Sequence, residues 1–274
     1  MKKIMRIGIV GCGAIGSSLA AAVAKDFKGK ARLTAVFDTD AAKADTLSRA
    51  QGRGAHLAVR DLSQLIARAE LVIESASARS SWAIAKASLA KGRSVMIMSV
   101  GGVARHLPAL RKLSERHRQK VYIPSGALAG IDALKAARED RIRGVTLTTR
   151  KNPRAFTSVP YVMKKKIDLS ALTRETLLFS GPAARAVTLF PQNINVAAIL
   201  GLAGIGSRKT RVRIVADPSL QENLHEVEIR SRAGDIFTRT RNRVHPRNPK
   251  TSYLAVLAAV AMLRQIVSPV VIGT

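Results

Sequence analysis

The 274-residue chain has little cysteine, few aromatic side chains and no long apolar run. Cys12 is its single cysteine, so no disulfide can form within the chain and no thiolate cluster can hold a metal. The longest apolar run, Tyr253 to Leu263, has 11 residues, whereas a membrane-spanning helix needs about 20. Because a chain without disulfides suits a reducing compartment, we expect a cytoplasmic protein with no membrane partner.

The N-terminus is similar to a secretory signal, since MKKIM precedes apolar residues and Ala22-Val23-Ala24. Arg6 interrupts this apolar stretch, and glycines 8, 11, 13 and 16 fit a nucleotide-binding turn better. Cleavage would also remove that turn. We therefore expect no signal peptide.

Acidic residues are scarce: 46 Lys and Arg face 18 Asp and Glu, which gives a net charge of +28. Such a charge attracts anions, and nucleic acid is the first partner to consider. The basic residues are spread through almost every segment, however, and aromatic residues for base stacking make up only 4% of the chain. No helix-turn-helix, zinc-finger or RNA-binding signature is present. We interpret the charge as a generally basic surface and expect no nucleic-acid partner.

Three spaced glycines follow the first apolar run, in the pattern Gly11-x-Gly13-x-x-Gly16. Gly11 permits a tight strand-to-helix turn, Gly13 lets the backbone approach a pyrophosphate, and Gly16 lets the helix pack on the strands. Ala14 and Ile15 begin that helix, where free N–H groups and the helix dipole favour phosphate. Asp38 ends the second apolar run, 22 residues beyond Gly16, where a carboxylate bonds ribose hydroxyls. The pattern predicts binding of a dinucleotide, NAD with NADP also possible.

Apolar runs and helical patterns alternate through the first half, which predicts a Rossmann-type, doubly wound parallel sheet covered by helices on both faces. The expected strands are 5–10, 32–37, 55–59, 71–75, 94–98 and 120–124, and the expected helices are 14–26, 40–50, 61–68, 80–90 and 105–117. Two short loops of small residues, Ser75–Ser77 and Ser99–Gly102, follow neighbouring strands. They suit either the approach of a nicotinamide ribose or an ordinary tight connection.

The pattern changes after residue 125. Segments 143–150, 210–216, 225–231 and 235–241 alternate like half-exposed antiparallel strands, and a helix is expected at 192–204. This predicts a second α+β domain with an open sheet of three to five strands. The expected organisation is a dinucleotide-binding domain at 1–125, a catalytic domain at 126–247, and a C-terminal segment, 248–274, whose helix packs back on the first domain.

Four blocks of the second half carry a more specific resemblance. They are PSGALAGIDAL (124–134), LFPQNINVAA (189–198), VADPSLQENLHEVEI (215–229) and NPKTS (248–252). With GCGAIG (11–16) and ESAS (74–77), they resemble the successive signature blocks of the L-aspartate dehydrogenase family. The resemblance runs end to end in the same order. It implies an NAD(P)-dependent enzyme, a homodimer, a dicarboxylate amino acid as substrate, and a place in NAD biosynthesis through iminoaspartate.

The resemblance also implies roles for three residues. The family's nicotinamide-contacting alanine corresponds to Ala127, its cofactor-contacting asparagine to Asn195, and its active-site histidine to His225. The chemistry supports His225 independently, because oxidative deamination leaves an imine that water must attack, and imidazole accepts protons near neutral pH. His225 stands in a polar cluster at the head of an expected strand. His245, in a basic loop, is a second candidate.

Two further polar groups are expected near helix starts. Asn193 and Asn195 lie where the helix at 192–204 begins, and they suit either a helix cap or an amide contact to cofactor and substrate. Lys250, Thr251 and Ser252 lie at the start of the last helix, expected at 250–266, and they suit either a cap or the binding of a substrate carboxylate.

The sequence thus predicts a two-domain α/β dehydrogenase that oxidises L-aspartate to oxaloacetate and ammonia through iminoaspartate. The spacing of acidic, His and Cys residues favours no metal. Two alternatives stay open. One is another amino-acid dehydrogenase or imine reductase on the same scaffold, and the other is a non-catalytic, basic protein that senses nicotinamide or binds nucleic acid.

Overall fold

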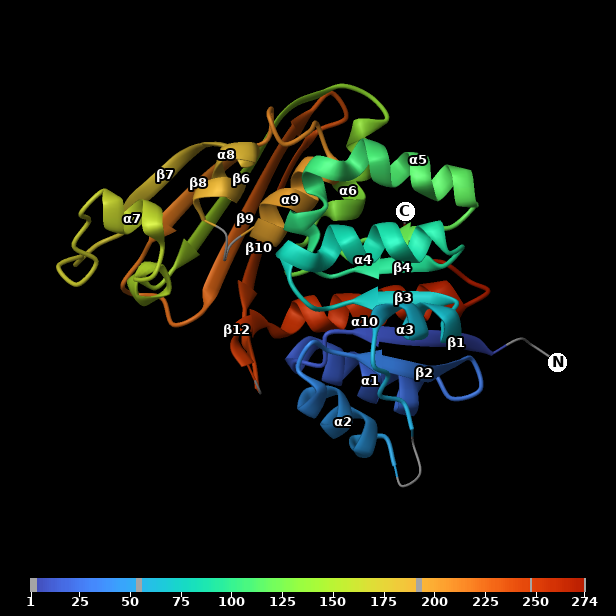
Figure 1. Cartoon of the computed structure of the whole chain (residues 1–274). Helices are drawn as coiled ribbons and strands as arrows, with labels where there is room; N and C mark the ends of the chain where they lie inside the picture. The colour runs from blue at the N-terminus through green and yellow to red at the C-terminus, as the bar shows by residue number, and fades with distance from the viewer. Residues whose placement is uncertain (1–3, 53–55, 191–193, 247, 274) are drawn as a thin grey trace. The chain divides into compact units, whose positions relative to one another are not determined.

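The computed structural model describes residues 4–52, 56–190, 194–246 and 248–273 (Figure 1). The chain forms two compact units. Unit 1 comprises Met1–Pro124 and Val256–Ile272, and unit 2 comprises Ser125–Ala255 and Gly273–Thr274. No helix in the described ranges is long and apolar enough to cross a membrane.

Unit 1 is built on a five-stranded parallel sheet in the order β2-β1-β3-β4-β5. Its strands are β1 (Met5–Val10), β2 (Ala31–Phe37), β3 (Leu71–Glu74), β4 (Ser94–Ile97) and β5 (Val121–Tyr122). Its helices are α1 (Ala14–Asp26), α2 (Ala41–Ala50), α3 (Leu62–Arg68), α4 (Ala78–Ala90) and α5 (Leu107–His117), with 3-10 turns at Val100–Gly102 and Ala104–His106. This confirms the Rossmann-type sheet.

The central strands of unit 1 are almost continuously apolar because helices cover both of their faces. All four residues of β3 are buried, and so are Ile7 and Ile9 of β1. The strand expected at 55–59 is wrong for the described residues 56–59, which contribute only an isolated bridge from Ala58 to Val36. One backbone pair is enough to place this segment beside β2 without forming a strand.

The last helix, α10 (Tyr253–Val267), belongs to unit 1 from Val256 onward. Its buried residues Ala259 and Leu263 join the same apolar cluster as Leu19 and Val23 of α1. The core of unit 1 is therefore assembled from the two ends of the chain.

Unit 2 holds a mixed five-stranded sheet in the order β10-β9-β6-β8-β7. Its strands are β6 (Ile142–Lys151), β7 (Thr176–Pro182), β8 (Arg211–Ala216), β9 (Asn223–Ser231) and β10 (Asp235–Asn242), and a separate hairpin pairs β11 (Val244–His245) with β12 (Asn248–Ser252). Its helices are α6 (Ile131–Arg138), α7 (Pro160–Lys164), α8 (Ala183–Leu189) and α9 (Ile194–Ala203), with a 3-10 turn at Pro153–Phe156. The expected open sheet and the hairpin turn at Arg232–Gly234 are confirmed.

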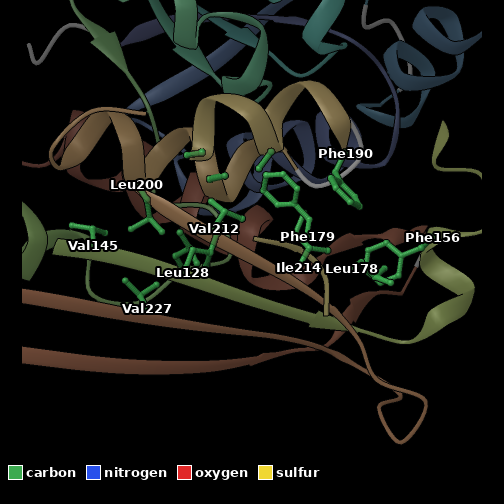
Figure 2. Close-up of a cluster of buried hydrophobic side chains, with 14 of the residues drawn as sticks. Leu128, Val145, Phe156, Leu178, Phe179, Phe190, Leu200, Val212, Ile214 and Val227 are labelled. Carbon is green, nitrogen blue, oxygen red and sulfur yellow. The ribbon is translucent and has the colours of Figure 1, made fainter. Parts of the chain in front are cut away.

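One face of the unit 2 sheet carries the apolar core. Figure 2 shows side chains such as Val145, Val212 and Val227 gathered with Leu200 of α9 and Phe179. Odd-numbered residues of β6 and β9 and even-numbered residues of β8 and β10 point to this inner face, because side chains alternate along a strand. The register of the sheet therefore decides which polar residues share the inner face.

Two sequence-based expectations for unit 2 need correction, and some of its elements were not predicted. The strand at 143–150 is not purely antiparallel, since β6 pairs with β9 antiparallel and with β8 parallel. The last helix begins at Tyr253, and residues 248–252 form β12 instead. Strand β7 and helices α6 and α8 were not predicted, because their short apolar runs lack a clear period.

Candidate functional site

The glycine loop between β1 and α1 is shaped as a phosphate cradle. Gly11 has φ 92°, and a Cβ there would lie 2.5 Å from the carbonyl oxygen of Ser75. A Cβ on Gly16 would lie 1.9 Å from the carbonyl oxygen of Gly11. At Gly13, by contrast, a Cβ would meet nothing within 4 Å. Gly11 and Gly16 are therefore required by the protein's own packing, while Gly13 leaves the open space that a pyrophosphate needs.

Helix α1 starts at Ala14 with Gly13 as its N-cap, and no side chain caps it. The first N–H groups of a helix have no partner within the helix, so those of Ala14 and Ile15 suit an anion. The expected cofactor contacts at Gly13, Ala14 and Ile15 therefore occupy one helix terminus beside the cradle.

Asp38 follows β2 and ties this loop together. Its Oδ2 accepts a hydrogen bond from the backbone N–H of Cys12 at 2.7 Å, and its Oδ1 accepts one from the N–H of Asp40 at 3.0 Å. Burial, together with the charge of Asp38, raises the pKa of Cys12 to about 12, so the thiol stays protonated. Asp38 thus positions the loop, and its bond to a ribose remains a prediction.

Glu74, which the sequence interpretation passed over as part of ESAS, is a buried clamp at the end of β3. Its side chain is 0% exposed. Oε1 accepts from the N–H of Ala76 at 2.9 Å, and Oε2 accepts from the N–H of Ser99 at 3.0 Å. Burial raises the pKa of Glu74, and these backbone donors act against that rise. The carboxyl group joins the two small-residue loops that follow β3 and β4, and its sequence signal was an acid ending an apolar strand.

His225 lies in unit 2 on β9, where the inner face of the sheet changes from apolar to polar. It precedes Val227 and Ile229 on that face and is 5% exposed. Its register partner on β6 is Thr149, whose Oγ1 lies 3.1 Å from His225 Nδ1. Burial and the charge of Lys151 lower the pKa of His225 to about 3. The imidazole is therefore neutral, with Nδ1 fixed by the hydroxyl group.

Hydrogen bonds connect the carbonyl oxygen of Ala127 to this polar end of the sheet. This oxygen accepts from Asn242 Nδ2 at 3.1 Å and from Thr240 Oγ1 at 3.3 Å. Thr240 is the register partner of His225 on β10. The Oδ1 of Asn242 in turn accepts from Ser252 Oγ at 3.0 Å. The structure thus connects Ala127 to His225 through Thr240 and to Ser252 through Asn242, and sequence reasoning missed both of these linking residues.

The other predicted residues of unit 2 lie elsewhere or are not described. Asn195 is exposed near the start of α9, and Asn193 lies outside the described residues. Lys250 and Thr251 belong to β12, so they precede the helix start that was expected to bind a carboxylate. The first N–H of α10, that of Tyr253, already donates to the carbonyl oxygen of Arg243 at 3.0 Å.

His245 does not join His225. It is 4% exposed, and its ring packs edge-on against Tyr253 with the centroids 5.6 Å apart. Its surroundings are those of a packed residue in the hairpin β11–β12.

The second half of the chain, residues 132–266, matches the family model "Aspartate dehydrogenase, C-terminal", and residues 11–124 match "Homoserine dehydrogenase, NAD binding domain". The L-aspartate dehydrogenase of Methanosarcina barkeri is 42% identical over 273 residues, which cover 99% of this chain and 100% of that protein. The chain belongs to the L-aspartate dehydrogenase family. The resemblance of the signature blocks is therefore confirmed.

Solved structures agree with this family. The crystal structure of aspartate dehydrogenase from Thermotoga maritima matches with a TM-score of 0.76 and 25% identity, over 99% of this chain and 100% of that chain. A hyperthermophilic archaeal homoserine dehydrogenase in complex with NADPH shares the fold, with a TM-score of 0.59 and 13% identity, over 94% of this chain and 97% of that chain. The match of residues 11–124 to an NAD binding domain model supports a pyridine nucleotide as the cofactor class of this aspartate dehydrogenase family member.

Two hollows lie on the unit 2 sheet, and neither is lined by His225. One of about 530 Å³ is lined by Arg143, Gly144, Thr146, Glu228, Arg230 and Asp235. These residues lie on or beside the outer face of the sheet, opposite the apolar core, and none of them is an expected site residue. Within the described ranges, no three His, Cys, Asp or Glu side chains gather in a way that could hold a metal ion. The inner face around His225 therefore stays the predicted site of this aspartate dehydrogenase family member.

Proposed function

We propose that the protein is an NAD(P)-dependent L-aspartate dehydrogenase, which oxidises L-aspartate to iminoaspartate and so to oxaloacetate and ammonia. The observation that carries this proposal is the end-to-end similarity to relatives with that name, over 99% of the chain. The buried polar end of the unit 2 sheet supports it, because it supplies a neutral imidazole in protected surroundings.

We assign cofactor binding to residues of unit 1 and proton transfer to residues of unit 2. The glycine loop of unit 1 holds the pyrophosphate, and Asp38 bonds the adenosine ribose. A bound nicotinamide supplies the acceptor for the hydrogen and electron pair that leave the substrate Cα. We expect a modest preference for NAD, because a carboxylate at the ribose repels a 2′-phosphate.

His225 is the proposed general base. In the tautomer in which Nδ1–H donates to Thr149 Oγ1, Nε2 carries no proton and accepts one from the substrate ammonium or from the water that attacks the imine. A pKa of about 3 is low for a base. The negative carboxylates of L-aspartate raise it, since a nearby opposite charge favours the imidazolium. The substrate therefore helps to activate its own base.

We place the reaction in NAD biosynthesis, with iminoaspartate as the compound passed on, and the enzyme in the cytoplasm. The family relationship supports this assignment. We further propose a homodimer formed through the outer face of the unit 2 sheet, where Phe237 is 71% exposed beside the ion pair of Glu226 and Arg239. Light scattering of wild-type protein and Phe237→Asp tests the dimer: a dimeric variant contradicts this interface.

The deciding experiment is steady-state kinetics with a panel of amino acids and both cofactors. We expect reduction of NAD with L-aspartate, less with NADP, and much less with L-glutamate or L-alanine. Activity confined to another amino acid would support the alternative of a different dehydrogenase on this scaffold.

His225→Ala should lower kcat about 10²–10⁴-fold, the usual contribution of a general base. NAD affinity should change little, because the glycine loop belongs to unit 1. The matched control is His245→Ala, which removes a buried histidine of the same unit and should leave kcat within about threefold of wild type. Wild-type turnover in His225→Ala would remove the histidine from the mechanism.

A further inference from the structure

Lys151 ends β6 two residues after Thr149, so both side chains belong to the inner face of the sheet. Thr149 pairs with His225 across the sheet, and the charge of Lys151 acts on that histidine. The backbone of Lys151 is fixed on its other side, because it pairs with Ala216 and its carbonyl oxygen accepts from Asp217 N–H at 2.9 Å. Lys151 is therefore held at the polar end of the inner face, next to the proposed base.

The ammonium group of Lys151 has no carboxylate partner among the described residues. Its neighbour Arg150, on the outer face, contrasts with it, because Arg150 is paired with both Glu175 and Glu226. Burial alone lowers the pKa of Lys151, to about 8. Burying an unpaired cation costs free energy that a folded protein usually avoids by pairing it. Arg150, one residue earlier on β6, shows that the outer face of the sheet offers paired surroundings for a cation.

We propose that Lys151 binds a carboxylate group of the substrate beside His225, an inference that rests on the proposed function and adds a residue to its site. A substrate carboxylate supplies the negative charge that the Lys151 ammonium lacks among the described residues. It also relieves the repulsion that keeps His225 from accepting a proton. A dicarboxylate amino acid is the substrate class that this arrangement favours over neutral amino acids.

The test uses the full chain with Lys151→Met, Lys151→Arg and the control Lys164→Met, since Lys164 is an exposed lysine of the same unit. Hydrogen bonds to charged groups contribute about 1.5–3 kcal/mol, so Lys151→Met should raise the KM for L-aspartate about 10- to 150-fold. The KM for NAD should stay within about twofold, because the nucleotide loop is in unit 1. Lys151→Arg should recover part of the loss, and Lys164→Met should match wild type.

A second measurement does not depend on turnover. Succinate is titrated by calorimetry into the protein loaded with NADH, and its dissociation constant should rise in Lys151→Met by the same factor as the KM. Unchanged KM and succinate affinity in Lys151→Met would overturn the inference, and so would the absence of succinate binding in wild type. If wild type binds succinate through Lys151 and yet does not oxidise L-aspartate, the proposed function fails while the carboxylate site stands.

Discussion

Lys151→Met should make the protein without substrate more stable. The pKa of Lys151 is lowered from 10.5 to about 8 by burial, and the side chain is only partly exposed. A difference of about 2.5 pH units corresponds to about 3 kcal/mol as an upper limit. Methionine keeps most of the side-chain volume and removes the buried charge. We therefore expect the free energy of unfolding to rise by about 1–3 kcal/mol at pH 7.

The pH dependence gives the sign of the effect. Below pH 8 the ammonium is charged in both states, and its burial cost is fully present. Between pH 8 and 10.5 the folded protein has released this proton while the unfolded chain retains it, so wild type gains stability relative to the methionine variant. The difference between the two proteins should therefore close by about pH 10.5.

Scanning calorimetry at pH 7 and pH 10.5 measures both effects, with an expected rise in Tm of about 2–4 °C for each kcal/mol. Lys164→Met serves as the control and should leave the Tm unchanged at both pH values, since Lys164 is exposed. Equal stability of wild type and Lys151→Met at pH 7 would refute the reasoning, because the ammonium would then be solvated. A gain that persists unchanged at pH 10.5 would refute it too.

The remaining predictions concern three substitutions in unit 1. Gly13→Ala should fold with a near wild-type Tm but lose NAD affinity in a fluorescence titration, because its Cβ would occupy open space that the pyrophosphate needs. Gly16→Ala should lose NAD affinity too, but it should also lower the Tm, because its Cβ would lie 1.9 Å from the carbonyl oxygen of Gly11. The same Tm in the two variants would contradict this interpretation of the loop. Asp38→Ala should raise the ratio of kcat/KM for NADP to that for NAD and lower the Tm, because the N–H of Cys12 loses its acceptor. An unchanged ratio would mean that Asp38 serves only the loop.

The first half of the fold was predictable because its signals are local. The helix expected at 14–26 has those bounds in the structure, since a glycine turn starts it and an apolar period of 3.6 runs through it. The prediction of a strand at 55–59 was wrong for the described residues 56–59, because a short apolar run does not reveal whether a neighbouring strand is available for pairing. Strand β7 was missed because its short apolar run lacks a clear period, and because its pairing with β8, further along the chain, gives no local signal.

The candidate site was predictable only by residue type. His225 was predicted because few side chains titrate near neutral pH and because the family's active-site histidine corresponds to it, and its role stays a prediction. Lys151 and Asn242 were missed because their importance depends on register. Lys151 resembles any other of the chain's many basic residues until β6 is paired with β9, and Asn242 is one polar residue in a basic strand until it meets Ala127. Glu74 likewise becomes a clamp only when the loops after β3 and β4 are adjacent.

Helix α10 has a consequence for how the protein is made. Unit 1 takes its core from residues 1–124 and from the final helix, whose Ala259 and Leu263 are fully buried. Ribosomes release a chain from its N-terminus, and domains usually fold in that order. Here unit 2, almost entirely contiguous from Ser125 to Ala255, can close first, while the nucleotide-binding unit waits for the last residues synthesised. We therefore expect nucleotide binding to be the last property that a nascent chain acquires, and we expect a chain cut short before Val256 to lack it.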